Sequence, residues 1–277
     1  MSKDNKKNYF YSDCLNRVYI MGVLNVTPDS FSDGGKFYPF DSAIAHARQL
    51  TEDGADILDV GGESTRPGAD PVSLQEELDR TIPVIEKISK SLDVLISIDT
   101  YKSPVAEEAA KAGAHIINDI SGLTFDPDIS AVAARHDTAL VIMHIKGKPK
   151  TMQSNPEYKD AITEIKGFLF TACEQAQRRG VKKIIIDPGL GFGKRFEDNF
   201  VILKKIDQLK PLGYPILIGS SRKSYLGKLF DAAPLDRLEG TIVSNIIAMQ
   251  HGANILRVHD VKAIKRAVTI ANKIMNA

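Results

Sequence analysis

Two loops contain most of the side chains that could perform chemistry. Residues 25–35 read NVTPDSFSDGG and residues 61–69 read GGESTRPGA, and each loop directly follows an apolar run. Both are crowded with hydroxyl, amide, carboxylate and glycine groups and hold little that could form a core. Long polar loops of this kind usually bind ligands. The short oxygen-bearing side chains beside Thr65 and Arg66 suit a metal ion and an anion better than an apolar ligand.

Acidic and amide side chains end three further apolar runs, at Asp99, Asn118 and Asp187. Because buried carboxylates are costly without partners, we interpret these residues as ligand-binding. An ionised Asp187 can accept two parallel N–H bonds from the guanidine-like edge of a pterin or a guanine, and Asn118 can complete that edge. The glycine-rich turn that begins at Asp187, DPGLGFGK, lacks the spacing of a nucleotide-binding P-loop. His144 ends another run, and its position is equally compatible with packing and with function.

Basic side chains follow the last two apolar runs. Arg222 and Lys223, in GSSRKSYLG, lie at the expected start of a helix. Cations there oppose the helix macrodipole, so their placement favours ligand binding over stability. A Schiff-base role for Lys223 is the alternative, and the neighbouring Arg222 disfavours it. Arg257 and His259 are two residues apart in RVHD, so on a strand both side chains can point at one anion.

The elements that must position these residues recur about eight times along the chain. A short β-branched run ends in polar residues and a segment with helical periodicity follows; the runs are VYIMGVLN, DILDVGG, VLISIDT, HIINDI, TALVIMH, KIIIDPG, PILIGSS and NILRVHD. This alternation predicts a parallel sheet covered by helices. Eight units without a break in composition predict a single α/β domain, a closed (β/α)8 TIM barrel with long loops after its first two strands. An open doubly wound sheet is the alternative. In a barrel, the polar ends of the strands meet at one active site.

Bulk properties narrow the class of protein. The chain has 277 residues and a net charge of +1, which gives no sign of nucleic-acid binding. No apolar run approaches about 18 residues and the polar N-terminus has no signal core, so we expect no membrane association. Cys14 and Cys173 have no metal-ligand or disulfide spacing, which fits a reducing compartment. We expect a cytoplasmic protein, with residues 1–16 as a loose N-terminal extension and residues 17–277 as the barrel.

Eight motifs of the chain, taken in order, resemble those of the dihydropteroate synthase family of pterin-binding enzymes. They are NVTPDSFSDGG, GGESTRPGA, SIDT, NDISG, MHIKGKPKTMQ, DPGLGFGK, GSSRKS and RVHD. The resemblance spans residues 18–272. It implies a transferase of folate (tetrahydrofolate) biosynthesis that condenses 6-hydroxymethyl-7,8-dihydropterin pyrophosphate with 4-aminobenzoate, releasing pyrophosphate. It also implies bound Mg2+, a homodimer and sulfonamides as competitors of the aminobenzoate.

The same resemblance implies roles for individual residues. Pterin binding is implied for Asp99, Asn118, Ile120, Met143, Asp187, Gly219 and Lys223. Pyrophosphate binding is implied for Asn25, Thr65, Arg66, Arg257 and His259, and Asn25 is also the implied Mg2+ ligand. Contact with the aminobenzoate is implied for Phe31, Pro67, Phe192, Ser221 and Arg222. Catalytic roles are implied for Asp33, Asp99 and Lys223, with Asp33 helping the first loop to organise the site.

The expected chemistry needs no nucleophilic triad. Pyrophosphate leaves readily once Mg2+ and arginine neutralise it, and carboxylates can stabilise a cationic transition state. Two other functions are compatible with a pterin pocket: a methyltetrahydrofolate-binding corrinoid methyltransferase and a non-catalytic pterin-binding barrel. The anion-binding motifs GGESTRPG and RVHD disfavour the first, and the metal-binding Asn25 disfavours the second.

Overall fold

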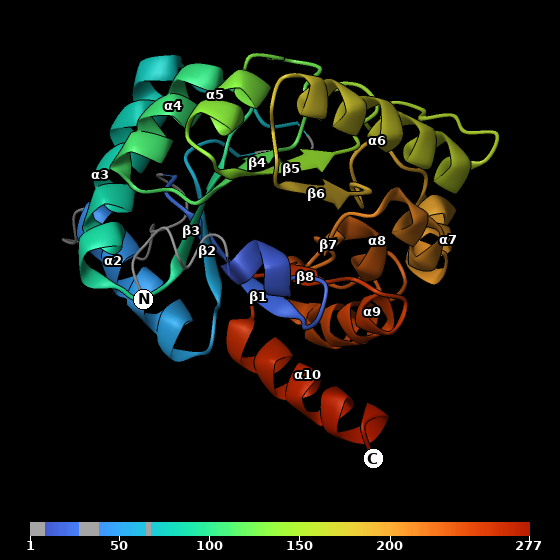
Figure 1. The fold of residues 1–277 in the computed structure, drawn as a ribbon. Coiled ribbons are helices and arrows are strands. Elements are labelled where there is room, and N and C mark those ends of the chain that lie inside the picture. The colour runs from blue at the N-terminus through green and yellow to red at the C-terminus, as the bar shows by residue number, and fades with distance from the viewer. Residues whose placement is uncertain (1–8, 28–38, 65–67) are drawn as a thin grey trace.

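The computed structural model describes residues 9–27, 39–64 and 68–277, which form a barrel of parallel strands ringed by helices (Figure 1). The strands are β1 (Tyr19–Asn25), β2 (Ile57–Gly61), β3 (Leu95–Asp99), β4 (Ile116–Asp119), β5 (Ala139–Met143), β6 (Ile184–Asp187), β7 (Leu217–Ile218) and β8 (Ile255–Val258). They are hydrogen-bonded in the order β6-β5-β4-β3-β2-β1-β8-β7. A parallel bridge between Ile186 and Ile216 joins the two ends of this order. The predicted (β/α)8 barrel is therefore confirmed, and the open-sheet alternative is wrong.

Helices follow the strands and cover the outside of the barrel (Figure 1). The helical elements are α2 (Pro39–Glu52), α3 (Leu74–Ser91), α4 (Ser103–Ala112), α5 (Ile129–Arg135), α6 (Ala161–Arg178), α7 (Phe196–Lys204), η2 (Ile206–Leu212), α8 (Ser224–Gly227), η3 (Pro234–Asp236), α9 (Leu238–Gln250) and α10 (Val261–Met275). The left-handed Gly113, with φ of 116°, ends α4, a position that favours glycine. Within the described residues, no helix is both long and apolar enough to cross a membrane.

Side chains on each strand alternate between the barrel interior and the helical shell. Along β2, Leu58 and Val60 belong to the outer core, whereas Ile57 belongs to the interior cluster. Asp59, two residues after Ile57, therefore also points inward. The interior is apolar at the amino ends of the strands and polar at their carboxyl ends, where it contains Asp59, Asp99, Asn118, Asp187 and Arg257. This gradient places the reactive groups at one end of the barrel.

Residues at the N-terminus close the apolar end of the barrel. A short helix over residues 9–13, drawn in blue beside β1 in Figure 1, buries Phe10 against the interior cluster. The Phe10 ring meets the Tyr19 ring edge-on at 4.9 Å, and Cys14 is fully buried. Our expectation of a loose extension is therefore wrong for residues 9–14. Their aromatic side chains cover an apolar floor that would otherwise face water.

Tyr11 fastens this helix to the floor, and its removal gives a test of the contact. The Tyr11 hydroxyl donates to the Ile184 carbonyl at 3.1 Å and accepts from the Ile184 N–H at 3.2 Å. We expect Tyr11→Phe to lower the free energy of unfolding by about 1–3 kcal/mol without changing kcat, because the floor is opposite the polar end. Urea titration measures this, with the exposed Tyr9→Phe as control. Equal stability of both variants would contradict the fastening role.

Candidate active site

A cleft opens at the polar end of the barrel, between the carboxyl ends of the strands. Its lining residues are Asp99, Asn118, Ile120, Met143, Asp187, Leu190, Phe192, Gly219, Lys223 and Arg257. All of the residues for which the resemblance implies pterin binding are among them. The lining residues come from six strands, β3 to β8, or from the loops after them, and the parallel register brings them together, as where Asp99 pairs with Asn118.

Arg257 holds two carboxylates in the cleft. Its Nε donates to Asp59 Oδ2 at 2.6 Å and its Nη2 donates to Asp99 Oδ2 at 2.6 Å. The Asn118 amide also donates to Asp59 Oδ2, at 3.1 Å. The guanidinium predicted to bind an anion is therefore also the counter-ion of buried acids. Asp59 orients both Arg257 and Asn118, so it fixes two groups that face the cleft.

Two carboxylate oxygens in this network still have capacity to accept hydrogen bonds. Asp59 Oδ1 and Asp99 Oδ1 are buried, and neither has a hydrogen-bond partner among the described residues. Asp187 Oδ1, by contrast, accepts the Gly189 N–H at 2.7 Å. Buried acceptors are normally satisfied, so the unsatisfied Oδ1 of Asp99, which lines the cleft, favours a ligand that donates N–H groups.

Burial shapes the protonation of the cleft. It raises the pKa of Asp187 to about 6, against the opposing effect of the Gly189 N–H. It also raises the pKa of Asp99, an effect that the Arg257 guanidinium opposes. Burial, followed by repulsion from Arg257, lowers the pKa of Lys223 to about 8. The pKa values of Asp99, Asp187 and Lys223 are thus all moved toward physiological pH, so a charged ligand can change the protonation of these groups.

One wall of the cleft is apolar. Ile120, Met143 and Phe192 belong to a single buried cluster. Lys223 Nζ lies 4.1 Å from the centre of the Phe192 ring, a cation–π distance. A planar heterocycle can therefore lie against this wall with its polar edge toward Asn118 and Asp187. This combination of apolar face and polar edge fits a pterin.

The glycine-rich turn after β6 is built around Lys194. Its buried Nζ donates to the carbonyls of Gly189 at 3.0 Å and Phe192 at 2.9 Å, and it lies 2.9 Å from His144 Nδ1. A Cβ on Gly189 would lie 2.0 Å from the His144 carbonyl oxygen, so only glycine fits this left-handed position. Lys194 thereby fixes the turn that presents Asp187 and Phe192 to the cleft.

His144 has a structural place in this arrangement. It is buried and meets the Phe168 ring edge-on at 4.9 Å. Burial, together with the charge of Lys194, lowers the pKa of His144 to about 2. The imidazole is neutral at physiological pH, and the packing interpretation of His144 is favoured over acid–base chemistry.

The Lys194 ammonium should give the protein a characteristic pH dependence. Burial lowers its pKa to about 7, below the value of about 10.4 in an unfolded chain. Between these values the unfolded state binds the extra proton, so stability due to Lys194 rises with pH, by up to about 1.4 kcal/mol per unit. Lys194→Met should flatten that rise. Urea unfolding at pH 7 and pH 9.5 measures it, with the exposed Lys90→Met as control. Parallel wild-type and Lys194→Met curves would contradict the buried-ammonium account.

A second polar group lies beyond the cleft, after β7 and β8. Ser221 Oγ accepts the His259 N–H at 3.1 Å and lies 3.0 Å from His259 Nδ1. Arg222, in a left-handed conformation with φ of 57°, donates from Nε to Asp260 Oδ2 at 2.9 Å. His259 and Ser221, predicted for different ligands, are thus direct neighbours. The Arg222 guanidinium is held by Asp260, which sets the direction in which it could meet a ligand.

Asn25 ends β1, opposite Gly61 of the neighbouring strand β2. Its Oδ1 lies 3.6 Å from where a Cβ on Gly61 would be, and Asp99 Oδ2 lies 3.9 Å from the same point. The missing side chain of Gly61 thus leaves space between two oxygens. No group of three metal-binding His, Cys, Asp or Glu side chains occurs in the described part of the chain. The side-chain oxygen of Asn25 is the hard type of donor that Mg2+ takes.

Five predicted site residues lie outside the described residues: Phe31, Asp33, Thr65, Arg66 and Pro67. Their roles stay predictions.

The chain matches the family described as pterin binding enzyme over residues 21–259. It is 48% identical over 259 residues to the dihydropteroate synthase of Synechocystis, which covers 92% of this chain and 90% of that one. The chain belongs to the dihydropteroate synthase family.

Solved structures of the dihydropteroate synthase family have the same fold. The Clostridium difficile enzyme, determined in the presence of pteroic acid, matches with a TM-score of 0.89 and 48% identity, covering 95% of this chain and 98% of that one. The Xanthomonas albilineans enzyme with 4-aminobenzoic acid matches with a TM-score of 0.90 and 40% identity, covering 96% of this chain and 98% of that one.

Two residues that support the lining of this cleft, Asp59 and Lys194, were given no role from the sequence. Asp59 stands in the apolar run ILDVG, where its inward position follows from a two-residue spacing to Ile57. An acid at an interior strand position is the signal that could have identified it. Lys194 ends the GFGK motif, but its burial depends on how the glycine turn folds back on His144. Sequence alone carries no sign of that fold.

Proposed function

We infer that this chain catalyses the condensation of 6-hydroxymethyl-7,8-dihydropterin pyrophosphate with 4-aminobenzoate, giving 7,8-dihydropteroate and pyrophosphate. The observation that carries the proposal is that all the residues for which the resemblance implies pterin binding line one cleft, which has an apolar wall and an acidic edge. Membership of the dihydropteroate synthase family supports the same reaction.

The pterin binds with its guanidine-like edge toward Asp187 and Asn118. Asp187 accepts N–H bonds from the edge and Asn118 offers both a donor and an acceptor. Ile120 and Met143 contact one face of the ring. The unsatisfied Oδ1 of Asp99 accepts a further ring N–H, while Gly219 leaves room for the ligand and Lys223 supplies a cation at its edge.

The pyrophosphate lies toward Arg257 and His259, with Thr65 and Arg66 contributing from the second loop. The contacts of Arg257 with carboxylates use Nε and Nη2, and a guanidinium has five N–H donors, so others are available to phosphate oxygens. Asn25 would hold Mg2+, which when bound neutralises the leaving pyrophosphate.

The reaction breaks the bond between the pterin methylene carbon and the pyrophosphate oxygen, and forms a bond from that carbon to the amine nitrogen. Positive charge develops on the pterin as the anion leaves, and Asp99 stabilises it. The arylamine is largely neutral at pH 7, so its proton can be lost after attack without a strong base. Phe192, Ser221 and Arg222 border the amine, with Phe31 and Pro67, and Asp33 helps to exclude water.

A coupled assay of pyrophosphate release tests this function. Release from the pterin ester should depend on 4-aminobenzoate and yield equimolar 7,8-dihydropteroate. Turnover with methyltetrahydrofolate and a corrinoid would instead favour the methyltransferase alternative, and pterin binding without turnover would favour a non-catalytic barrel. Omitting Mg2+ should lower the rate and weaken the pterin ester more than the free pterin. An equal rate in a metal chelator would contradict the Mg2+ assignment.

We also propose that the chain forms a homodimer and acts in the cytoplasm. Phe230, Leu235 and Val243 are exposed by 80%, 79% and 56%, on or beside elements α8, η3 and α9, which contact one another. Apolar side chains gathered on neighbouring elements favour a self-complementary interface. Sedimentation equilibrium should report twice the chain mass, and Phe230→Glu should shift it toward the monomer.

A further inference from the structure

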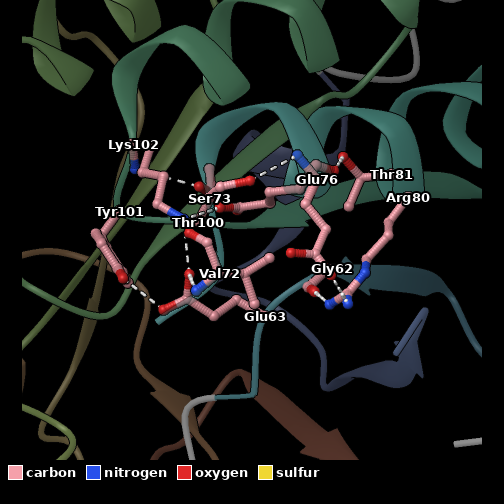
Figure 2. A network of polar contacts seen from close by, with 11 residues as sticks. Gly62, Glu63, Val72, Ser73, Glu76, Arg80, Thr81, Thr100, Tyr101 and Lys102 are labelled. Atoms are coloured by element: carbon pink, nitrogen blue, oxygen red, sulfur yellow. Dashed lines mark hydrogen bonds and ion pairs between the residues drawn. The ribbon is translucent and has the colours of Figure 1, made fainter. Parts of the chain in front are cut away.

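One lysine joins both ends of the loop between β2 and α3 (Figure 2). Lys102 Nζ donates to Glu63 Oε2 at 2.6 Å and to the Val72 carbonyl at 2.8 Å. It donates again to Glu77 Oε2, in the first turn of α3, at 2.5 Å. An ammonium group has three N–H donors, so these contacts use its full capacity.

Glu63 completes the connection from the other side. Its Oε2 accepts the Val72 N–H at 3.1 Å, and its Oε1 accepts the Tyr101 hydroxyl. The Arg80 guanidinium donates to the Gly62 carbonyl at 2.7 Å, next to Glu63 (Figure 2). The beginning and end of the loop are therefore tied to each other and to α3. We call Glu63, Glu77 and Lys102 the loop clamp.

The loop clamp is buried beyond what a surface ion pair needs. The exposed fractions of the Glu63, Glu77 and Lys102 side chains are 7%, 1% and 18%. Burial alone would lower the Lys102 pKa, but its bonds to the two glutamates outweigh burial and raise it. Two carboxylates around one ammonium leave a net negative charge. Removing these charges from water costs free energy, so a gain in stability does not account for the arrangement.

The loop clamp adjoins the cleft. Tyr101 and Lys102 directly follow Asp99 and Thr100 at the end of β3. The Tyr101 ring meets Phe125 edge-on at 5.4 Å, and both rings pack against the cluster that forms the apolar wall of the cleft. The base of the loop is thus attached to the same segment that carries Asp99 into the site.

We propose that Lys102 is a positioning residue of the synthase reaction, which through Glu63 fixes the base of the residue 64–71 loop beside Asp99. The two ends of this loop are then held in one position relative to Asp99. The proposal rests on the proposed function, since the loop sequence holds Thr65 and Arg66, which that function assigns to the pyrophosphate, and Pro67, which it assigns to the amine. It does not involve the pterin ring, which binds deeper in the barrel.

Lys102→Met tests the loop clamp, because methionine keeps most of the volume and removes the charge. We expect KM for the pterin ester and for 4-aminobenzoate to rise at least about tenfold, since small displacements of positioning groups cost that much or more. The Kd of unphosphorylated 6-hydroxymethyl-7,8-dihydropterin, measured by calorimetry, should stay within about twofold of wild type. The control is Lys111→Met, which removes an exposed lysine paired with Glu107 and Glu108 on α4.

A milder variant covers the case in which Lys102→Met does not fold. Tyr101→Phe keeps the ring contact with Phe125 and removes only the hydroxyl bond to Glu63, so both KM values should rise about threefold with only a small loss of thermal stability. Unchanged KM values in a folded Lys102→Met, or in Tyr101→Phe if Lys102→Met is unfolded, would overturn the proposal. An equal loss of free-pterin affinity would also overturn it, by showing general support of the barrel. Absence of wild-type turnover would instead refute the proposed function.

Discussion

Arg257→Met should lower the free energy of unfolding by about 3–5 kcal/mol and weaken binding of the pterin ester far more than of the free pterin. The first effect follows because Asp59 and Asp99 would stay buried without their shared counter-ion. The second follows because the guanidinium faces the side of the cleft assigned to pyrophosphate, next to His259. Urea unfolding measures the first effect, and calorimetry with the two pterins measures the second.

A second variant separates these two roles of Arg257. Arg257→Met combined with Asp59→Asn removes a carboxylate together with its partner, so part of the stability should return while pyrophosphate binding stays weak. The exposed Arg178→Met, which breaks only a surface pair with Glu174, is the control and should change neither property. If Arg257→Met weakens both pterins equally, Arg257 supports the barrel and does not bind the phosphate.

Asp187→Asn should raise the Kd of the pterin by about 30- to 1,000-fold, equivalent to about 2–4 kcal/mol. The structure gives the reason. Asp187 Oδ1 accepts the Gly189 N–H, and an asparagine would keep that bond with its oxygen. Its amide nitrogen would then face the ligand, where a donor meets the N–H donors of the guanidine-like edge.

Asp187→Asn should weaken pterin binding without destabilising the fold, which distinguishes a binding role from a folding role. Because burial raises the pKa of Asp187 to about 6, the folded state holds a proton more tightly than the unfolded one. Asp187 therefore destabilises the protein progressively as pH rises from about 4 to 6. Asp187→Asn should not lower the free energy of unfolding at pH 7. A Kd within twofold of wild type would remove Asp187 from the pterin edge, and the exposed Asp128→Asn is the control.

The fold was accessible from sequence because the alternation of apolar runs and helical segments is nearly uniform. The run ending in Asp99 and the run ending in Asn118 become neighbouring strands β3 and β4, in the register that brings both side chains into one cleft. A parallel barrel converts the last residue of each run into a member of one site, so strand ends could be interpreted one at a time.

The partners within the site were not accessible in the same way. Asp59 and Arg257 are 198 residues apart, and their contact depends on barrel closure and on which interior layer each occupies. The loop clamp depends on the direction of the Lys102 side chain, which reaches Glu77. In the sequence, Lys102 is a lysine just after a strand and would be expected to be solvated. Residues 9–14 pack against the apolar amino end of the barrel, a surface that forms only when the strands assemble. No pattern in their own sequence predicts this contact.

The closed amino end of the barrel also determines the route by which substrates and products reach and leave the site. Phe10, Tyr19 and Met21 fill the amino end of the barrel, and among the described residues the packed interior leaves no passage from one end to the other. In that part of the chain, the site therefore opens at the carboxyl ends of the strands. Pyrophosphate and dihydropteroate must leave by the route along which both substrates arrived. Each product therefore has to leave through the opening by which the next substrate enters, so product release is a step of every turnover.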